Sequence, residues 1–122
     1  MKANLNEITI NGTVYVPKSE TAMAANTDGM PYVIIRTYSA GVHAGYLKSR
    51  DGKEVELVNA RRIWYWKGAA SLSQMAVSGV KCPKECKFSV AVPSIFLTEA
   101  IEIIPCTNEA MQNIQEVPEW KA

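Results

Sequence analysis

Residues 31–58 read PYVIIRTYSAGVHAGYLKSRDGKEVELV, and this stretch decides the fold. Three runs within it alternate with the period of two that is typical of β-strands, at Pro31–Tyr38, Val42–Ser49 and Glu54–Val58. Two short turns separate the runs, one made of small residues and one containing Asp-Gly. Strands joined by such short turns lie antiparallel. The stretch therefore predicts an antiparallel meander.

The first predicted strand carries large side chains on both faces. Val33, Ile35 and Thr37 share one face. The other face holds Tyr32, Ile34, Arg36 and Tyr38. Arg36 thus lies between apolar and aromatic neighbours, an unusual position for a charge. In the second strand, Gly45 predicts a bulge or a close approach to the backbone.

The next stretch, Asn59–Gln74, reads NARRIWYWKGAASLSQ and combines two arginines with three aromatics. Alternation places Arg61, Ile63 and Tyr65 on one side. The other side receives Arg62, Trp64 and Trp66. The two arginines are therefore expected to point to opposite faces. Ser71-x-x-Gln74 matches a capping box, which predicts a short helix that Gly79 ends.

The C-terminal part of the chain predicts a loop, two further strands and a second helix. These are the loop Lys81–Lys87, the strand Phe88–Val92 ended by Pro93, the strand Ile95–Pro105 with a bulge near Ala100, and the helix Thr107–Gln115. Trp120 in the tail is expected to pack back onto the fold.

Before the meander, Glu7–Pro17 alternates around Asn11-Gly12, which predicts a β-hairpin with a type I′ turn. Lys18–Met30 is small and polar and predicts a linker, with a short helical turn at Glu20–Ala25. We therefore expect one α+β domain over residues 1–122, with an antiparallel sheet and two short α-helices. Residues 1–29 form a hairpin arm and linker, and residues 30–122 a compact ligand-binding core.

Composition narrows the function classes. The chain is 48% hydrophobic and 20% charged, which favours a folded domain, and its formal charge of +1 argues against a duplex-binding protein. No apolar run is long enough to span a membrane, and the N-terminus does not resemble a secretory signal. Three cysteines without such a signal indicate free thiols and a cytoplasmic location.

The residues give little support for catalysis. Cys82, Cys86 and Cys106 could be assembled with His43 into a zinc site, but free thiols explain them better. His43 is the single histidine and is expected to be a partly exposed structural residue. Solvated carboxylates account for Glu99 and Glu102 about as simply as an acid–base pair does. We expect a binding protein, without catalytic residues, metal or cofactor.

The arginine–aromatic run has two interpretations. Core aromatics beside arginines that extend to solvent would explain it. Alternatively, guanidinium groups, π-faces and a nearby helix start would form a pocket for an anionic, base-containing small molecule.

Three strings in the chain carry a family resemblance: YVIIRTYSAGVHAGYLKSRDGKEVELVNARRIWYWKGAASLSQ, LTEAIEIIPCT and the terminal PEW. With them the chain resembles the first-described family of phage Thoeris anti-defence sponge proteins, from about Met30 to Trp120. The resemblance implies a protein that binds glycocyclic ADP-ribose, made by bacterial TIR-domain enzymes, without degrading it. It also implies cyclic trinucleotides of CBASS defence as further ligands, homo-oligomers (dimers built up into hexamers), and the cytoplasm of the infected host.

The matched strings and their chemistry nominate the ligand-binding residues. For phosphates these are Arg36, Arg61 and Arg62; for base stacking Trp64, Tyr65, Trp66 or Tyr38; and for ribose or base edges Asn59, Ser71, Ser73 and Gln74. Replacing Arg61 or Trp64 by alanine is expected to weaken binding and leave the fold intact. Two other classes stay open: a hydrolase of the messenger, and a structural or nucleic-acid-associated phage module.

Overall fold

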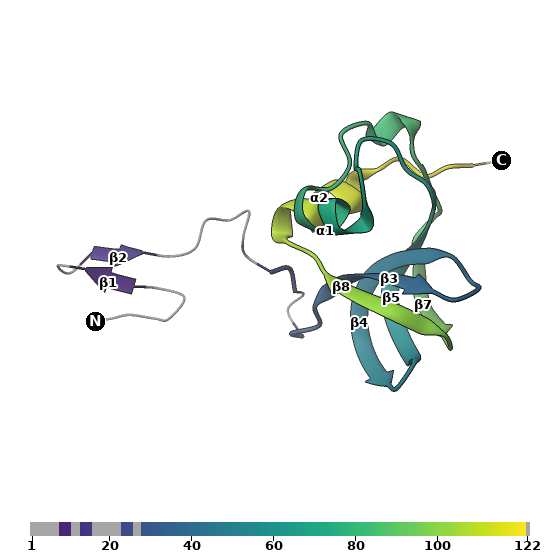
Figure 1. Ribbon diagram of the computed structural model, residues 1–122, viewed down its shortest axis with the longest axis horizontal. Helices are drawn as coiled ribbons and strands as arrows, with labels where there is room; N and C mark the ends of the chain where they lie inside the picture. Colours follow the sequence, from purple (N-terminus) through teal and green to yellow (C-terminus); the bar gives the residue numbers. More distant parts are fainter. Residues whose placement is uncertain (1–7, 11–12, 16–22, 26–27, 122) are drawn as a thin grey trace.

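The computed structural model describes residues 8–10, 13–15, 23–25 and 28–121. It confirms the α+β class, with an antiparallel sheet and two helices (Figure 1). The six strands of the main sheet are β3 (Tyr32–Thr37), β4 (Val42–Asp51), β5 (Glu54–Tyr65), β6 (Lys87–Phe88), β7 (Val92–Leu97) and β8 (Ala100–Pro105).

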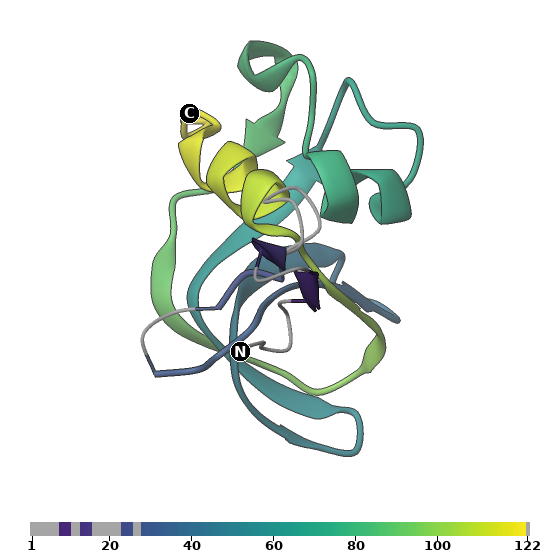
Figure 2. The same cartoon turned by 90° about the vertical axis from the view of Figure 1, so that its left-hand side faces the viewer.

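The twelve-residue strand β5 is the spine of this sheet. One of its edges pairs with β4, and the other pairs with β7 over its first half and with β6 near its end. The meander continues from β4 to β3 and on to β8. Because β7 and β8 are consecutive in the chain but lie on opposite edges, the sheet must curl (Figure 2). A hydrogen bond of 3.0 Å from Ala100 N to Lys53 O supports this curl.

Two strand predictions are wrong in this region. Ile95–Pro105 is not one bent strand, because the chain leaves β5 at Leu97 and starts pairing with β3 at Ala100. Phe88–Val92 is not a strand either, since β6 ends at Phe88 and β7 begins at Val92. Pro93 lies inside β7, which a proline tolerates because β7 pairs on one side only.

The predicted bulges are confirmed. The register between β4 and β5 shifts at Gly45, opposite Asn59, which adopts a left-handed φ of 52°. A Cβ on Gly45 would lie 3.0 Å from the Ala60 Cα and 3.1 Å from the Val58 carbonyl oxygen, so the backbones approach too closely for a side chain. A second shift, between β3 and β8, leaves Ile101 unpaired.

Each face of the sheet buries its own apolar core. The enclosed face holds Val33 and Ile35 of β3 together with Leu57 of β5. The outer face packs Tyr32 and Ile34 against the two helices (Figure 1). Both faces of β3 are therefore buried, as its apolar composition predicts.

Helix α1 (Leu72–Ser78) begins and ends as predicted. The Ser71 hydroxyl accepts from Gln74 N at 3.1 Å, and the Gln74 side-chain oxygen accepts from Ala70 N at 2.8 Å. Gly79 ends the helix with φ 75°. Helix α2 (Asn108–Glu116) is capped by Thr107, as expected. A short 3₁₀ turn, η2 (Pro83–Glu85), lies in the predicted loop.

Strands β1 (Ile8–Ile10) and β2 (Thr13–Tyr15) pair antiparallel, which confirms the N-terminal hairpin, whereas its turn at Asn11-Gly12 lies outside the described residues. Of the predicted linker, residues 18–22 and 26–27 also lie outside them. The helical turn predicted to reach Ala25 is wrong for residues 23–25, which form β-bridges. Ala24 is buried and donates its N–H to Cys106 O at 2.9 Å, so it joins the core ahead of Met30.

We expect Gly45→Ala to lower the free energy of unfolding by about 1–3 kcal/mol, because the added methyl group has no space beside β5. Urea unfolding measures the change. Ser49→Ala, at an exposed position of the same strand, is the control and should stay within about 0.5 kcal/mol of the wild type. Equal midpoints for the two variants would contradict the close approach at Gly45.

Candidate functional site

Strand β5 divides the predicted ligand-binding residues between two surfaces. Arg61 is buried, with 5% of its surface exposed, and lies on the side of α2. Arg62 and Trp64 are exposed and line a groove with the β3–β4 turn. The prediction that the two arginines point to opposite faces is confirmed, so they do not form one phosphate clamp.

Arg61 is held almost entirely by main-chain oxygens. Its Nη1 donates to the carbonyls of Ile114 at 2.8 Å and Val117 at 2.7 Å. Its Nε donates to Ser89 O at 2.8 Å and its Nη2 to Phe88 O at 3.4 Å. A guanidinium has five N–H groups, so one remains for another partner. Arg61 is therefore primarily a structural anchor, and its capacity to bind phosphate is small.

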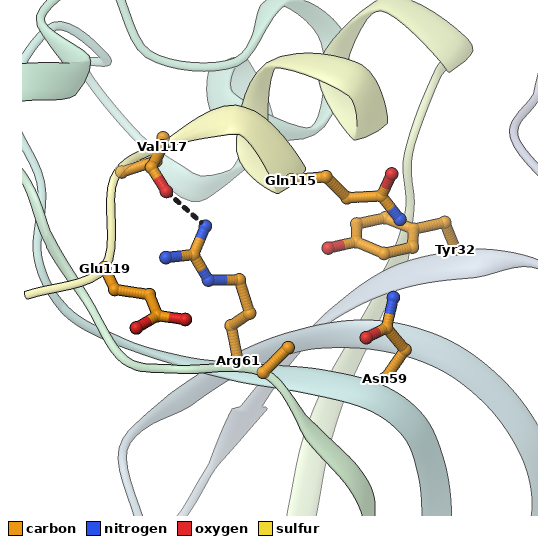
Figure 3. Close-up of a pocket in the computed structure, with 7 residues that line it drawn as sticks. Tyr32, Asn59, Arg61, Gln115, Val117 and Glu119 are labelled. Atoms are coloured by element: carbon orange, nitrogen blue, oxygen red, sulfur yellow. Dashed lines mark hydrogen bonds between the residues drawn. The ribbon is translucent and has the colours of Figure 1, made fainter.

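A cavity of about 220 Å³, here called the Tyr32 cavity, adjoins this anchor (Figure 3). It is lined by Tyr32, Asn59, Arg61, Ala91, Gln115, Val117 and Glu119. The Tyr32 hydroxyl is buried and has no hydrogen-bond partner among the residues that the structure describes. Burial raises the pKa of Tyr32, so the group stays a neutral hydroxyl. A buried hydroxyl without a partner costs about 1–3 kcal/mol, which marks this position as unusual.

A second, more open depression of about 410 Å³, here called the Arg62 groove, lies beside the β3–β4 turn. Its lining residues are Ser39, Ala40, Gly41, Val42, Arg62, Ile63, Trp64 and Trp66. Arg62 Nη1 donates to Ala40 O at 2.9 Å, which orients the guanidinium against the turn. Trp66 donates its indole N–H to Ala69 O at 3.2 Å and packs against the core.

Trp64 projects from the rim of the groove. It is 66% exposed and stacks on Trp120, with 6.3 Å between ring centroids and 21° between the planes. Lys87 Nζ lies 5.1 Å from the centroid of the Trp120 ring. The expected return of Trp120 onto the fold is confirmed, and its partner is the most exposed tryptophan of the predicted site.

The other nominated residues line neither the Tyr32 cavity nor the Arg62 groove. Arg36 forms an exposed ion pair with Glu102 at 2.8 Å. Tyr38 and Tyr65 are exposed, and Ser73 is exposed on the first turn of α1. Ser71 and Gln74 are engaged in capping α1. At the start of α1, the Ser71 hydroxyl therefore already accepts from Gln74 N, one of the N–H groups expected to bind an anion.

His43 departs from its predicted exposure. Only 1% of its surface is exposed, and its Nε2–H donates to Ala40 O at 2.9 Å, the same carbonyl that Arg62 binds. Its Nδ1 is buried and finds no hydrogen-bond partner in residues 8–10, 13–15, 23–25 or 28–121. The three cysteines are free, and the described residues contain no cluster of three or more side chains suited to a metal ion.

Residues 30–114 match the family described as Domain of unknown function (DUF6948). The chain belongs to this family. The match spans β3 to β8 and most of α2, and so includes Arg61 and the whole Arg62 groove. No curated protein and no solved structure gives a significant match to the DUF6948 chain. No helix in its described part is long and apolar enough to cross a membrane.

We expect Arg61→Met to lower the free energy of unfolding of the DUF6948 domain by at least about 3 kcal/mol, because four hydrogen bonds from a buried charged donor are lost. Urea unfolding with an unchanged m-value measures this loss. Arg62→Met is the matched control and should cost less than about 1 kcal/mol, since Arg62 is exposed. These hydrogen bonds argue against the expectation that Arg61→Ala leaves the fold intact. Similar losses for both arginines would refute the anchor.

The single histidine gives a pH prediction. Burial lowers the pKa of His43 below its ordinary 6.5, so the unfolded chain binds a proton before the folded chain does. Stability is therefore complete above pH 6.5 and falls as the pH drops below it, with a slope of at most about 1.4 kcal/mol per pH unit. Unfolding at pH 7.5 to 5.5 measures this slope. His43→Gln should remove it, and equal slopes in both proteins would disprove the assignment.

Proposed function

We propose that this protein binds a small cyclic nucleotide of the glycocyclic ADP-ribose class in the Arg62 groove and sequesters it without chemical change. In the cytoplasm of an infected bacterium, this would keep a Thoeris effector silent. The observation that carries the proposal is the meeting of an exposed guanidinium, an exposed indole and a turn of small residues around one depression. The resemblance of the quoted strings to the sponge family supplies the ligand class.

The groove chemistry suits such a ligand. Arg62 uses one N–H on Ala40 O, which fixes its direction and leaves the other N–H groups for a phosphate. Trp64 offers a large exposed π-face to a base. The small side chains at Ala40 and Gly41 let a ligand approach the backbone. At about 410 Å³ the groove is within the usual range of small-molecule sites, about 300–1,000 Å³.

The residues near the Arg62 groove favour sequestration of the messenger over its hydrolysis. Glu102 is paired with Arg36, and Glu99 accepts a hydrogen bond from Ser39. His43, buried under the same turn, has its Nε2–H committed to Ala40 O. General acid–base chemistry needs a group within hydrogen-bond reach of the reacting atom, and none of the groove's lining side chains is a carboxylate or an imidazole.

One observation favours a second candidate function. The Trp64–Trp120 stack beside Lys87 presents two exposed rings and a cation, which is how single-stranded nucleic acid is bound. This would make the protein a nucleic-acid-associated phage module. Direct comparison of a short single-stranded oligonucleotide with the cyclic ADP-ribose isomer separates the two functions.

The decisive experiment incubates the protein with the product of a Thoeris TIR enzyme. We expect the messenger to disappear from the filtrate and to return chemically unchanged when the protein is heated, as followed by mass spectrometry. Recovery of a cleaved product would indicate a hydrolase. The same assay with a cyclic trinucleotide tests the second ligand class that the resemblance implies, and homo-oligomer formation is followed by light scattering.

Two variants test the groove itself. Arg62→Ala and Trp64→Ala should each weaken messenger binding by at least about tenfold in calorimetry, because each removes one principal contact. Their melting temperatures should stay close to that of the wild type, since both side chains are exposed. Arg50→Ala and Phe96→Ala are matched exposed controls outside the groove. Normal binding by both groove variants would move the ligand elsewhere.

A further inference from the structure

The Tyr32 cavity shares no lining residue with the Arg62 groove and plays no part in the proposed function. Three independent features distinguish it from an ordinary packing defect. The first is the Tyr32 hydroxyl: 0% of the surface of Tyr32 is exposed, and the hydroxyl has no hydrogen-bond partner within the described part of the chain. Figure 3 shows this hydroxyl directed between Arg61 and Asn59. Buried hydroxyls without partners are rare in folded proteins.

The second feature is the backbone of Asn59. Its φ of 52° is left-handed, and it stands opposite the Gly45 bulge. Left-handed non-glycine residues and bulges concentrate at binding sites, where they direct a side chain that regular pairing would send elsewhere. Here the conformation brings the Asn59 amide to the wall of the cavity (Figure 3).

The third feature is one N–H of Arg61. Four of the five guanidinium N–H groups donate to main-chain carbonyls, and the fifth is available to a ligand. Around the cavity the polar groups are mixed in kind: the amides of Asn59 and Gln115 each offer a donor and an acceptor. Ala91 and Val117 supply an apolar wall. The lining therefore matches a ligand with polar edges and an apolar face.

The charges of the lining residues and the volume of the cavity restrict the class of ligand further. Arg61 is already surrounded by carbonyl oxygens, and the Glu119 carboxylate lines the same cavity, so an anion gains little there and meets repulsion. An uncharged ligand avoids this repulsion. The volume of about 220 Å³ is below the usual lower limit of about 300 Å³ for drug-sized sites, and corresponds to several water molecules of about 30 Å³ each. A single ring system fits, and a nucleotide does not.

We infer that the Tyr32 cavity binds one uncharged, nucleobase-sized heterocycle that carries a hydrogen-bond donor and acceptor on neighbouring atoms. The Tyr32 hydroxyl and the Asn59 amide bind the polar edge. Because the Tyr32 hydroxyl is buried, a lining side chain moves when the ligand enters, and we assign this movement to Gln115, which is exposed and donates to the Tyr46 hydroxyl at 3.2 Å. The site is independent of the messenger and of the Arg62 groove.

Adenine and nicotinamide are suitable probes, with binding measured by saturation-transfer NMR and calorimetry on the full chain. Tyr32→Phe removes only the hydroxyl and should weaken both probes at least about tenfold. Its melting temperature should equal or exceed that of the wild type, because the hydroxyl has no partner to lose. Tyr65→Phe, half exposed outside the cavity, and Arg62→Ala, in the groove, should bind both probes normally. Nicotinate, the anion of matching shape, should bind at least about tenfold more weakly than nicotinamide.

Each contrary result overturns the inference. If neither adenine nor nicotinamide binds, the cavity serves water or nothing. If Tyr32→Phe binds the probes like the wild type, the hydroxyl is not a ligand contact. A clear fall in its melting temperature would show that the hydroxyl has a partner within the protein. Equal binding of nicotinate and nicotinamide would refute the charge argument, and loss of adenine binding in Arg62→Ala would assign the probe to the groove.

Discussion

The buried guanidinium of Arg61 is the interaction on which the rest of the structure depends. It joins β5 to Ser89 after β6, to the last turn of α2 and to the tail at Val117. These segments are distant in sequence, and Arg61 is hydrogen-bonded to all of them. The carbonyls at the end of α2 carry the negative end of the helix dipole, so a cation there is favoured as well as satisfied. One side chain thus closes the outer layer of the fold.

This anchor also determines how the two adjacent arginines differ. Because β5 alternates, fixing Arg61 inward places Arg62 outward, beside Trp64 and the Ser39–Gly41 turn. Arg61 holds the fold together through main-chain carbonyls, whereas Arg62 is exposed and donates a hydrogen bond to Ala40 O, so it is our candidate ligand contact. Asn59, with its left-handed φ, lies just before this pair, and its side-chain amide lines the Tyr32 cavity. Two candidate binding surfaces of different chemistry therefore adjoin neighbouring residues of one strand.

The sequence predicted those features that depend on residues close together in the chain. The meander, the caps at Ser71 and Thr107 and the bulge at Gly45 follow from periodicity and from backbone preferences of single residues. The split of Ile95–Pro105 into β7 and β8 was not predictable, because each half finds a different partner strand in the curled sheet. The burial of Ala24 and His43 was not predictable either, nor were the four carbonyls that accept hydrogen bonds from Arg61. Each of these depends on a segment that arrives from elsewhere in the chain.

The energetics of the proposed function set a requirement that one groove does not meet. A sponge must hold its messenger at nanomolar concentration, which corresponds to about −12 kcal/mol. The main contacts in the Arg62 groove are one guanidinium, giving about 1.5–3 kcal/mol per charged hydrogen bond, and one indole, giving about 1–3 kcal/mol for a stacked base. Even with two hydrogen bonds to a phosphate, these contacts fall short of the total before any ordering cost is subtracted. A second surface that encloses the ligand would supply the difference, and we propose that another copy of the chain provides it. Self-association is in this sense part of the proposed activity.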